Sequence, residues 1–199
     1  MKSPRFMLSI VLMSLSTLAF AQSDAGKPVV LSDPHMSGDK PVLSEAQKSF
    51  DTMKTFAGEW EGPVTVPEMP EMNGGKPMHV SLRVTSRGNA VVHEFQEANT
   101  LLDSTKYDHP VTMLYVDGGQ LNLVHYFDAG NRPHMTGKMS PDGKTLEFEL
   151  VDVSGSTERG HMQHAVFTYI DTNHHTEDWT YMMPGDKPMH AHFNVHRVN

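Results

Sequence analysis

The sequence predicts an all-β protein, an antiparallel up-and-down β-barrel of about ten strands preceded by one short N-terminal helix. Two observations lead to this fold class. Short segments alternate apolar and polar residues, and Gly, Asn or Asp separates them at regular spacing. Closing such a meander leaves no unpaired sheet edge, so a barrel is favoured over the alternative, a two-sheet sandwich.

The first 43 residues precede the predicted barrel domain, which spans residues 44–199. Lys2 and Arg5 precede an apolar run that ends in the small-x-small motif Ala19-Phe20-Ala21, as in a cleaved secretory signal over residues 1–21. The run is about 15 residues long, short of the ~20 that a membrane span needs. Residues 22–43 are rich in Pro, Ser, Gly and Asp and are predicted to be a flexible linker. We therefore expect a periplasmic or secreted protein without stable membrane insertion.

A short amphipathic helix is predicted over residues 44–55. Ser44 and Gln47 fit a capping box, and Ala46, Phe50 and Met53 follow at helical spacing. Gly58 ends this pattern.

The rest of the chain is predicted to form strands. Leu146, Phe148 and Leu150, for example, alternate with Glu147 and Glu149. Segments such as Asp117-Gly118-Gly119 supply the turn residues that tight hairpins require. The ten expected strands are 59–66, 78–86, 90–98, 111–116, 120–127, 134–139, 145–153, 160–170, 175–182 and 189–198.

Composition excludes several classes of function. The chain has 16 Lys and Arg against 24 Asp and Glu, a formal net charge of −8, and it loses Lys2 and Arg5 if the signal is removed. Nucleic-acid binding needs a basic face, so no nucleic-acid partner is expected. The absence of Cys excludes disulfides, thiolate catalysis and Cys-ligated metals.

The last predicted strand carries an unusual row of imidazoles. His190, His192 and His196 share one face with Asn194, because side chains two apart in a strand point the same way. Such a row is either a solvent-exposed face or part of a site in a barrel lumen. In a lumen it could bind haem iron or a divalent metal such as Cu or Zn. Glu177 or Asp178 on the neighbouring strand could supply an acidic partner.

Two further His residues continue apolar rows and are expected to point inward. His125 follows Leu121 and Leu123, and His93 lies between Val91 and Phe95. Each is either a hydrogen-bonded core residue or a polar group that orients a ligand.

A Met- and Pro-rich loop follows the first predicted strand. Met69 and Met72 have the spacing of thioether copper motifs, although they could equally pack over a barrel mouth. Motifs typical of catalysis are lacking: there is no Gly-x-Ser-x-Gly elbow, His-Glu-x-x-His helix or glycine-rich phosphate loop.

The segment Gly58-Glu59-Trp60-Glu61-Gly62 resembles the Gly-x-Trp-x-Gly entry of calycin-type barrels. In lipocalins, fatty-acid-binding proteins and nitrobindin-like haem barrels this Trp lies at the barrel base, which the resemblance implies for Trp60. His190 and Arg197 are similarly spaced to a His and an Arg in the last strand of nitrobindin-like barrels. That likeness implies His190 as the axial haem ligand.

The middle of the chain departs from nitrobindin-like barrels. The segment from His125-Tyr126 to Gly130-Asn131-Arg132-Pro133 looks more like that of bacterial secreted barrel proteins with a His-Tyr…Gly-Asn-x-Pro pattern. This departure weakens the case for haem and leaves the barrel unaffected.

These observations favour a non-catalytic barrel that binds a small apolar ligand, with haem as one candidate and Cu or Zn as a weaker one. The expected cofactor-binding residues are His190, His125, Arg132, Asn131 and Trp60, and the expected metal ligands are His190, His192 and His196. A His- and Met-based metal-binding protein and an enzyme with a His-lined lumen site are the two alternatives.

Overall fold

The computed structural model describes residues 42–198, and the predicted signal peptide and nearly all of the predicted linker lie outside this range. Helix α1 spans Glu45–Thr55. Ser44 caps its N-terminus, and the Ser44 side chain accepts a hydrogen bond from the Gln47 backbone N–H at 3.1 Å. The Gln47 side chain donates to Asp51 and not back to Ser44, so only half of the expected capping box forms. Within the described residues, no helix has the length and apolar character needed to span a bilayer.

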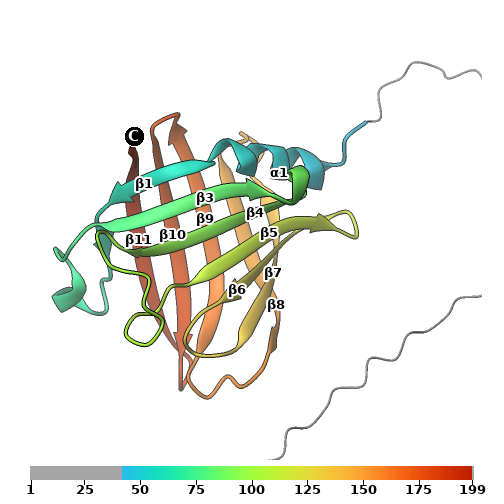
Figure 1. Cartoon of the computed structure of the whole chain (residues 1–199). Helices are drawn as coiled ribbons and strands as arrows, with labels where there is room; N and C mark the ends of the chain where they lie inside the picture. The colour runs from blue at the N-terminus through green and yellow to red at the C-terminus, as the bar shows by residue number, and fades with distance from the viewer. Residues whose placement is uncertain (1–41, 199) are drawn as a thin grey trace, which may run out of the picture. The chain divides into compact units, whose positions relative to one another are not determined.

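A continuous antiparallel sheet follows the helix, and each strand from β3 onward pairs with the next along the chain (Figure 1). The first strand, β1, also pairs with the last, β11, so ten strands form the closed barrel that the sequence predicts. The strands are β1 (Gly58–Gly62), β2 (Val64–Thr65), β3 (Met78–Thr85), β4 (Ala90–Glu97), β5 (Val111–Asp117), β6 (Gln120–Tyr126), β7 (Arg132–Met139), β8 (Thr145–Ser154), β9 (His161–Asp171), β10 (His174–Met183) and β11 (Lys187–Val198).

The first predicted strand, 59–66, is two strands in the structure. Pro63 separates β1 from β2 because it has no N–H to donate to a ladder. Its carbonyl instead accepts from the Asn194 N–H at 3.1 Å. The short β2 pairs only with β11 and lies outside the ten-strand ring.

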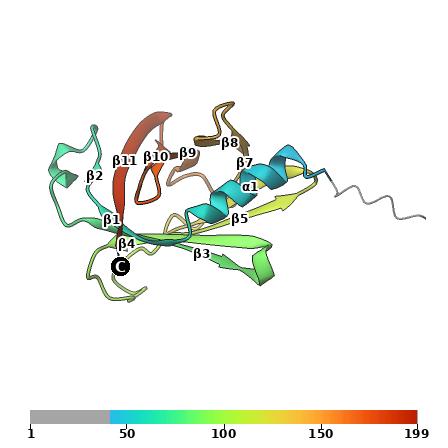
Figure 2. The same ribbon diagram turned by 90° about the horizontal axis from the view of Figure 1, so that it is seen from above.

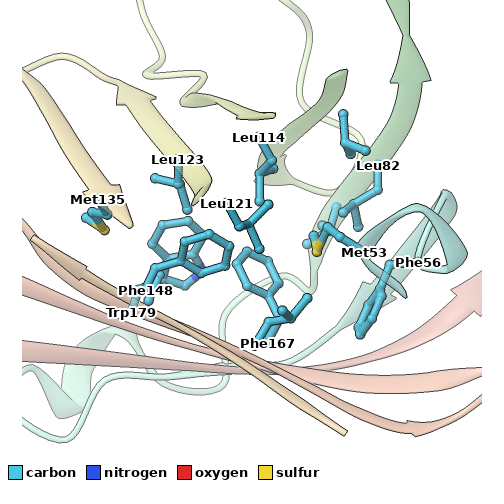
Figure 3. Close-up of a cluster of buried hydrophobic side chains, with 14 of the residues drawn as sticks. Met53, Phe56, Leu82, Leu114, Leu121, Leu123, Met135, Phe148, Phe167 and Trp179 are labelled. Carbon is cyan, nitrogen blue, oxygen red and sulfur yellow. The ribbon is translucent and has the colours of Figure 1, made fainter. Parts of the chain in front are cut away.

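Helix α1 closes one end of the barrel, where it contacts β5, β6 and β7 (Figure 2). Phe50, Met53 and Phe56 are buried against the core from this side. The interior is densely filled with apolar side chains (Figure 3). Its labelled members are Met53, Phe56, Leu82, Leu114, Leu121, Leu123, Met135, Phe148, Phe167 and Trp179.

The seam between β1 and β11 is fixed by Trp60 and Arg197, which are register partners. The Arg197 guanidinium lies 4.0 Å from the centroid of the Trp60 ring and donates to the Ala57 carbonyl at 2.8 Å. Trp60 Nε1 donates to the Phe56 carbonyl at 2.9 Å. A Cβ at Gly58 would come within 2.0 Å of Arg197 Nη1, so the glycine leaves the space that this cation–π contact occupies.

Substitution of Gly62 by Ala should weaken the seam. A Cβ there would meet the Asn194 carbonyl oxygen at 1.9 Å, so β1 and β11 would have to separate. We expect Gly62→Ala to lower the free energy of unfolding by about 1–3 kcal/mol in urea denaturation. Gly75→Ala, where the nearest atom is 3.7 Å away, is the control. Equal stability of the two variants would contradict this account of the seam.

Candidate ligand site in the barrel mouth

The C-terminal His row lies on the outside of the barrel. On β11, Phe193 and Val195 are buried, whereas His190 and His196 are exposed. Of the two alternatives for this row, the solvent-exposed face is therefore the one that the structure has, and the cofactor-binding role expected of His190 in the lumen is not met. The alternation itself is as predicted; pairing of β11 with β10 and β1 turns the other set of side chains inward.

The outward imidazoles have partners of their own. His190 Nδ1 lies 2.6 Å from Glu68 Oε1, and the backbone N–H of His190 donates to Glu68 Oε2 at 3.0 Å. These hydrogen bonds, the side-chain one first, lower the pKa of Glu68 to about 2. His192 Nδ1 lies 2.6 Å from Asp178 Oδ1, so Asp178 is the acidic partner that the sequence suggests. His196 stacks on His174, with ring centroids 4.2 Å apart.

This arrangement bears on the two cofactor expectations. A haem in the barrel cannot take His190 as an axial ligand, because that ring is on the outer face and bonded to Glu68, so the residues do not fit a haem held in this way. Metal binding by His190, His192 and His196 stays a prediction. In residues 42–198, only Glu147, Glu149 and His164 bring three metal-ligand atoms within 4.8 Å of one another. His164 already bonds Glu147 at 3.2 Å there.

A polar cluster lies in the barrel interior around Glu177. The carboxylate of Glu177 is fully buried and lies 3.0 Å from three ring nitrogens, those of His93, His175 and Trp179. Since an ionised carboxylate can only accept, all three nitrogens donate to it. Burial by itself raises the pKa of this carboxyl, but the His93 and His175 imidazoles outweigh burial and hold the pKa well below its ordinary value.

A third buried imidazole, His125, lies at the same level of the lumen as His93. His93, Thr112 and His125 are register partners on three neighbouring strands, β4, β5 and β6. Thr112 Oγ1 and His125 Nδ1 are 2.8 Å apart. Burial, with a smaller contribution from His93, lowers the pKa of His125 to about 3, so the ring is neutral at physiological pH. Its Nε2 is buried and has no hydrogen-bond partner among residues 42–198.

Above this polar level, at the end opposite α1, the barrel opens into an apolar cavity of about 400 Å³. Trp179, Phe95 and Phe193 lie deepest along their strands, and Met72 from the Met-rich loop reaches the cavity rim. The lining is apolar apart from Asp128 and the Tyr181 hydroxyl. Its members are Val64, Val66, Met72, Met78, Phe95, Phe127, Asp128, Met162, Trp179, Tyr181, Met189, Ala191 and Phe193.

The other predicted site residues have different positions. Trp60 lies at the seam between β1 and β11 and is 1% exposed. Asn131 is buried. Its Nδ2 donates to the carbonyls of Ser156 and Gly160 at 2.8 and 2.7 Å, which fixes the loop between β8 and β9. Arg132 is exposed at the start of β7. Of the five expected cofactor-binding residues, only His125 lies beside the cavity.

Sequence reasoning missed the centre of the polar cluster. His175, Glu177 and Trp179 alternate along β10 and share its inward face. An acidic residue between inward aromatic residues was the available signal, because a carboxylate on a buried face needs several donors. The donors His93 and His175 are 84 and 2 residues away from Glu177 in sequence, so only the closed sheet brings all of them together.

Comparison with solved structures supports the fold alone. The crystal structure of Rv2717c from M. tuberculosis is similar, with a TM-score of 0.52 and 15% sequence identity over 76% of this chain and 98% of that chain. No protein-family model matches the chain, and no curated protein matches it. The fold and the cavity define a closed antiparallel β-barrel, which fits a calycin-like fold and is compatible with ligand binding.

The Glu177 cluster should dominate the stability of the interior. Glu177→Ala leaves three buried N–H groups without an acceptor and should lower the free energy of unfolding by about 3–5 kcal/mol, measured by guanidinium denaturation at pH 7. Glu177→Gln, which keeps one carbonyl acceptor, should cost less.

The same cluster predicts a pH dependence. Because folding lowers the pKa of Glu177 below 4.5, its stabilisation is present above that pH and is lost as the pH falls. The stability difference between wild type and Glu177→Gln should therefore narrow below pH 4.5. A difference that widens as the pH falls would refute the assignment of Glu177 as a buried anion.

Proposed function

We propose that this protein binds a small, largely apolar molecule in the barrel mouth without converting it chemically. The observation that carries the proposal is the cavity of about 400 Å³ with an almost wholly apolar lining. Ligand pockets typically have volumes of roughly 300–1,000 Å³, apolar walls and few polar groups. The transfer of an apolar guest from water into such a site lowers the free energy and so favours binding.

The construction of the walls supports this function. Four methionines, Met72, Met78, Met162 and Met189, contribute to the lining from four different parts of the chain. Methionine side chains are flexible and polarisable, so they adapt to apolar guests of different shape. The floor is rigid by comparison, because Trp179 is hydrogen-bonded to Glu177 and packed against Phe167 with ring centroids 5.6 Å apart.

The loop after β2 holds one wall in place. Glu68 in this loop is bonded twice to His190 of β11, and the Val66 N–H donates to Asn73 Oδ1. Val66 and Met72 of the loop line the cavity. The role of His190 that these contacts favour is to anchor the loop at the rim of the ligand site.

Export of the protein is part of the proposal. It rests on the basic residues, the apolar run and the Ala19-Phe20-Ala21 motif at the N-terminus. A carrier in the periplasm or outside the cell would meet apolar molecules that have left a membrane.

Binding can be tested with the neutral fluorescent probe N-phenyl-1-naphthylamine, whose emission rises in an apolar site. We expect saturable one-to-one binding by the wild type. Ala191→Trp fills the cavity from β11 and should weaken binding at least about tenfold, equivalent to 1.4 kcal/mol. His192→Trp, one residue along on the outer face, is the matched control and should bind as the wild type does.

Folding of both variants is checked by thermal unfolding. If Ala191→Trp does not fold, Met189→Trp fills the same cavity closer to its rim. Probe binding that is unchanged by either cavity substitution would show that the cavity is not the binding site.

Export is tested by expressing the full chain in a Gram-negative bacterium and sequencing the N-terminus of the mature protein. The expected first residue is Gln22, in the periplasmic fraction or the medium. Recovery of the intact N-terminus from the cytoplasm would contradict the assigned signal peptide.

A further inference from the structure

A single layer of side chains separates the cavity from the imidazole of His125, whose Nε2 has no hydrogen-bond partner among the described residues. The His125 ring packs against three aromatic rings that line the cavity, with centroid distances of 6.4 Å to Phe95, 5.0 Å to Phe127 and 5.4 Å to Trp179. Its Nε2 is fully buried and has no partner among the described residues. A buried polar atom left without a hydrogen bond is destabilising. Three imidazole nitrogens lack a partner among the described residues, those of His93, His125 and His175, and of these rings only His125 contacts all three cavity-lining aromatic side chains, so the ligand can supply its missing partner.

Of the three rings, Phe127 is the one whose movement would connect His125 to the cavity. Trp179 is fixed by its bond to Glu177, and Phe95 packs on Phe193 at 5.3 Å between ring centroids. Phe127 follows the end of β6 at the start of a loop and is only partly buried. A ligand that displaces this ring would reach Nε2.

The charges around the cavity select the kind of polar group that can bind there. The nearest buried charge is the carboxylate of Glu177, and no Lys or Arg is buried among residues 42–198. At the rim, Asp128 forms an ion pair with Arg159 at 3.0 Å. An anionic group would lose its hydration beside the Glu177 carboxylate and would meet no buried Lys or Arg among the described residues, so it is disfavoured.

A hydroxyl group suits His125 in either of its neutral tautomers. If Thr112 donates to Nδ1, then Nε2 carries the hydrogen and donates to the ligand. If Nδ1 donates to Thr112, then Nε2 accepts from the ligand. A hydroxyl can serve as acceptor or donor, whereas a carboxylate can only accept.

We propose that the ligand is a neutral, largely apolar alcohol whose hydroxyl group hydrogen-bonds His125 Nε2. The inference rests on the proposed function and names the chemical class of its ligand. His125 is thus a specificity-determining residue that favours alcohols over the corresponding carboxylates.

The test compares three probes of equal chain length: octane, octan-1-ol and octanoate at pH 7.5, each displacing N-phenyl-1-naphthylamine. His125→Phe should weaken the binding of octan-1-ol about tenfold and leave the affinity for octane unchanged, since only the alcohol loses a hydrogen bond. Phe95→Leu is the control variant, because it alters the cavity wall and should change both affinities by the same factor. Octanoate should bind more weakly than octan-1-ol to the wild type.

A measurement on the wild type covers the case in which His125→Phe does not fold. The ¹⁵N NMR signal of His125 Nε2 should shift on saturation with octan-1-ol and not on saturation with octane. An equal loss of octane and octan-1-ol affinity in His125→Phe, an unmoved Nε2 signal, or tighter binding of octanoate than of octan-1-ol would each overturn the inference. Failure of octan-1-ol to displace a bound dye would also overturn the inference, whereas failure of the dye itself to bind the wild type would contradict the proposed function.

Discussion

The pairing of β1 with β11 is the constraint on which the other features depend. Trp60 and Arg197 meet across this seam, and two glycines, Gly58 and Gly62, leave room for the guanidinium and for the backbone of β11. Closure gives every strand one inner and one outer face. It also brings residues from both ends of the domain next to each other, as the bond between Arg197 and the Ala57 carbonyl shows.

Within the closed barrel, a buried polar level separates two apolar regions. Towards α1 the interior is fully packed, and towards the other end it opens into the mouth cavity. Between them, Glu177 accepts from His93, His175 and Trp179. A buried carboxylate is costly unless it is bonded in this way. Trp179 links the polar level to the mouth cavity, because its indole N–H donates to Glu177 and its ring forms part of the cavity floor.

The sequence predicted the elements better than the site. Alternation such as Leu146-Glu147-Phe148-Glu149 and turns such as Asp117-Gly118-Gly119 are local signals, so the strands and the barrel were accessible to it. Pro63 shows how a single local feature divides a strand. For the site, His125 was accessible because it continues an apolar row. Glu177 was not recognised as its centre, because its donor His93 comes from a distant strand.

The last strand shows the division between what sequence and tertiary structure decide. The sequence by itself determined that His190, His192 and His196 share one face of β11 and that Ala191 and Phe193 share the other, because side chains alternate along any strand. Which face turned inward was decided only when β11 paired with both β10 and β1. Turned inward, these imidazoles would have lost their contact with water, whereas turned outward His190 and His192 reach Glu68 and Asp178 at the surface, and the apolar side chains line the cavity.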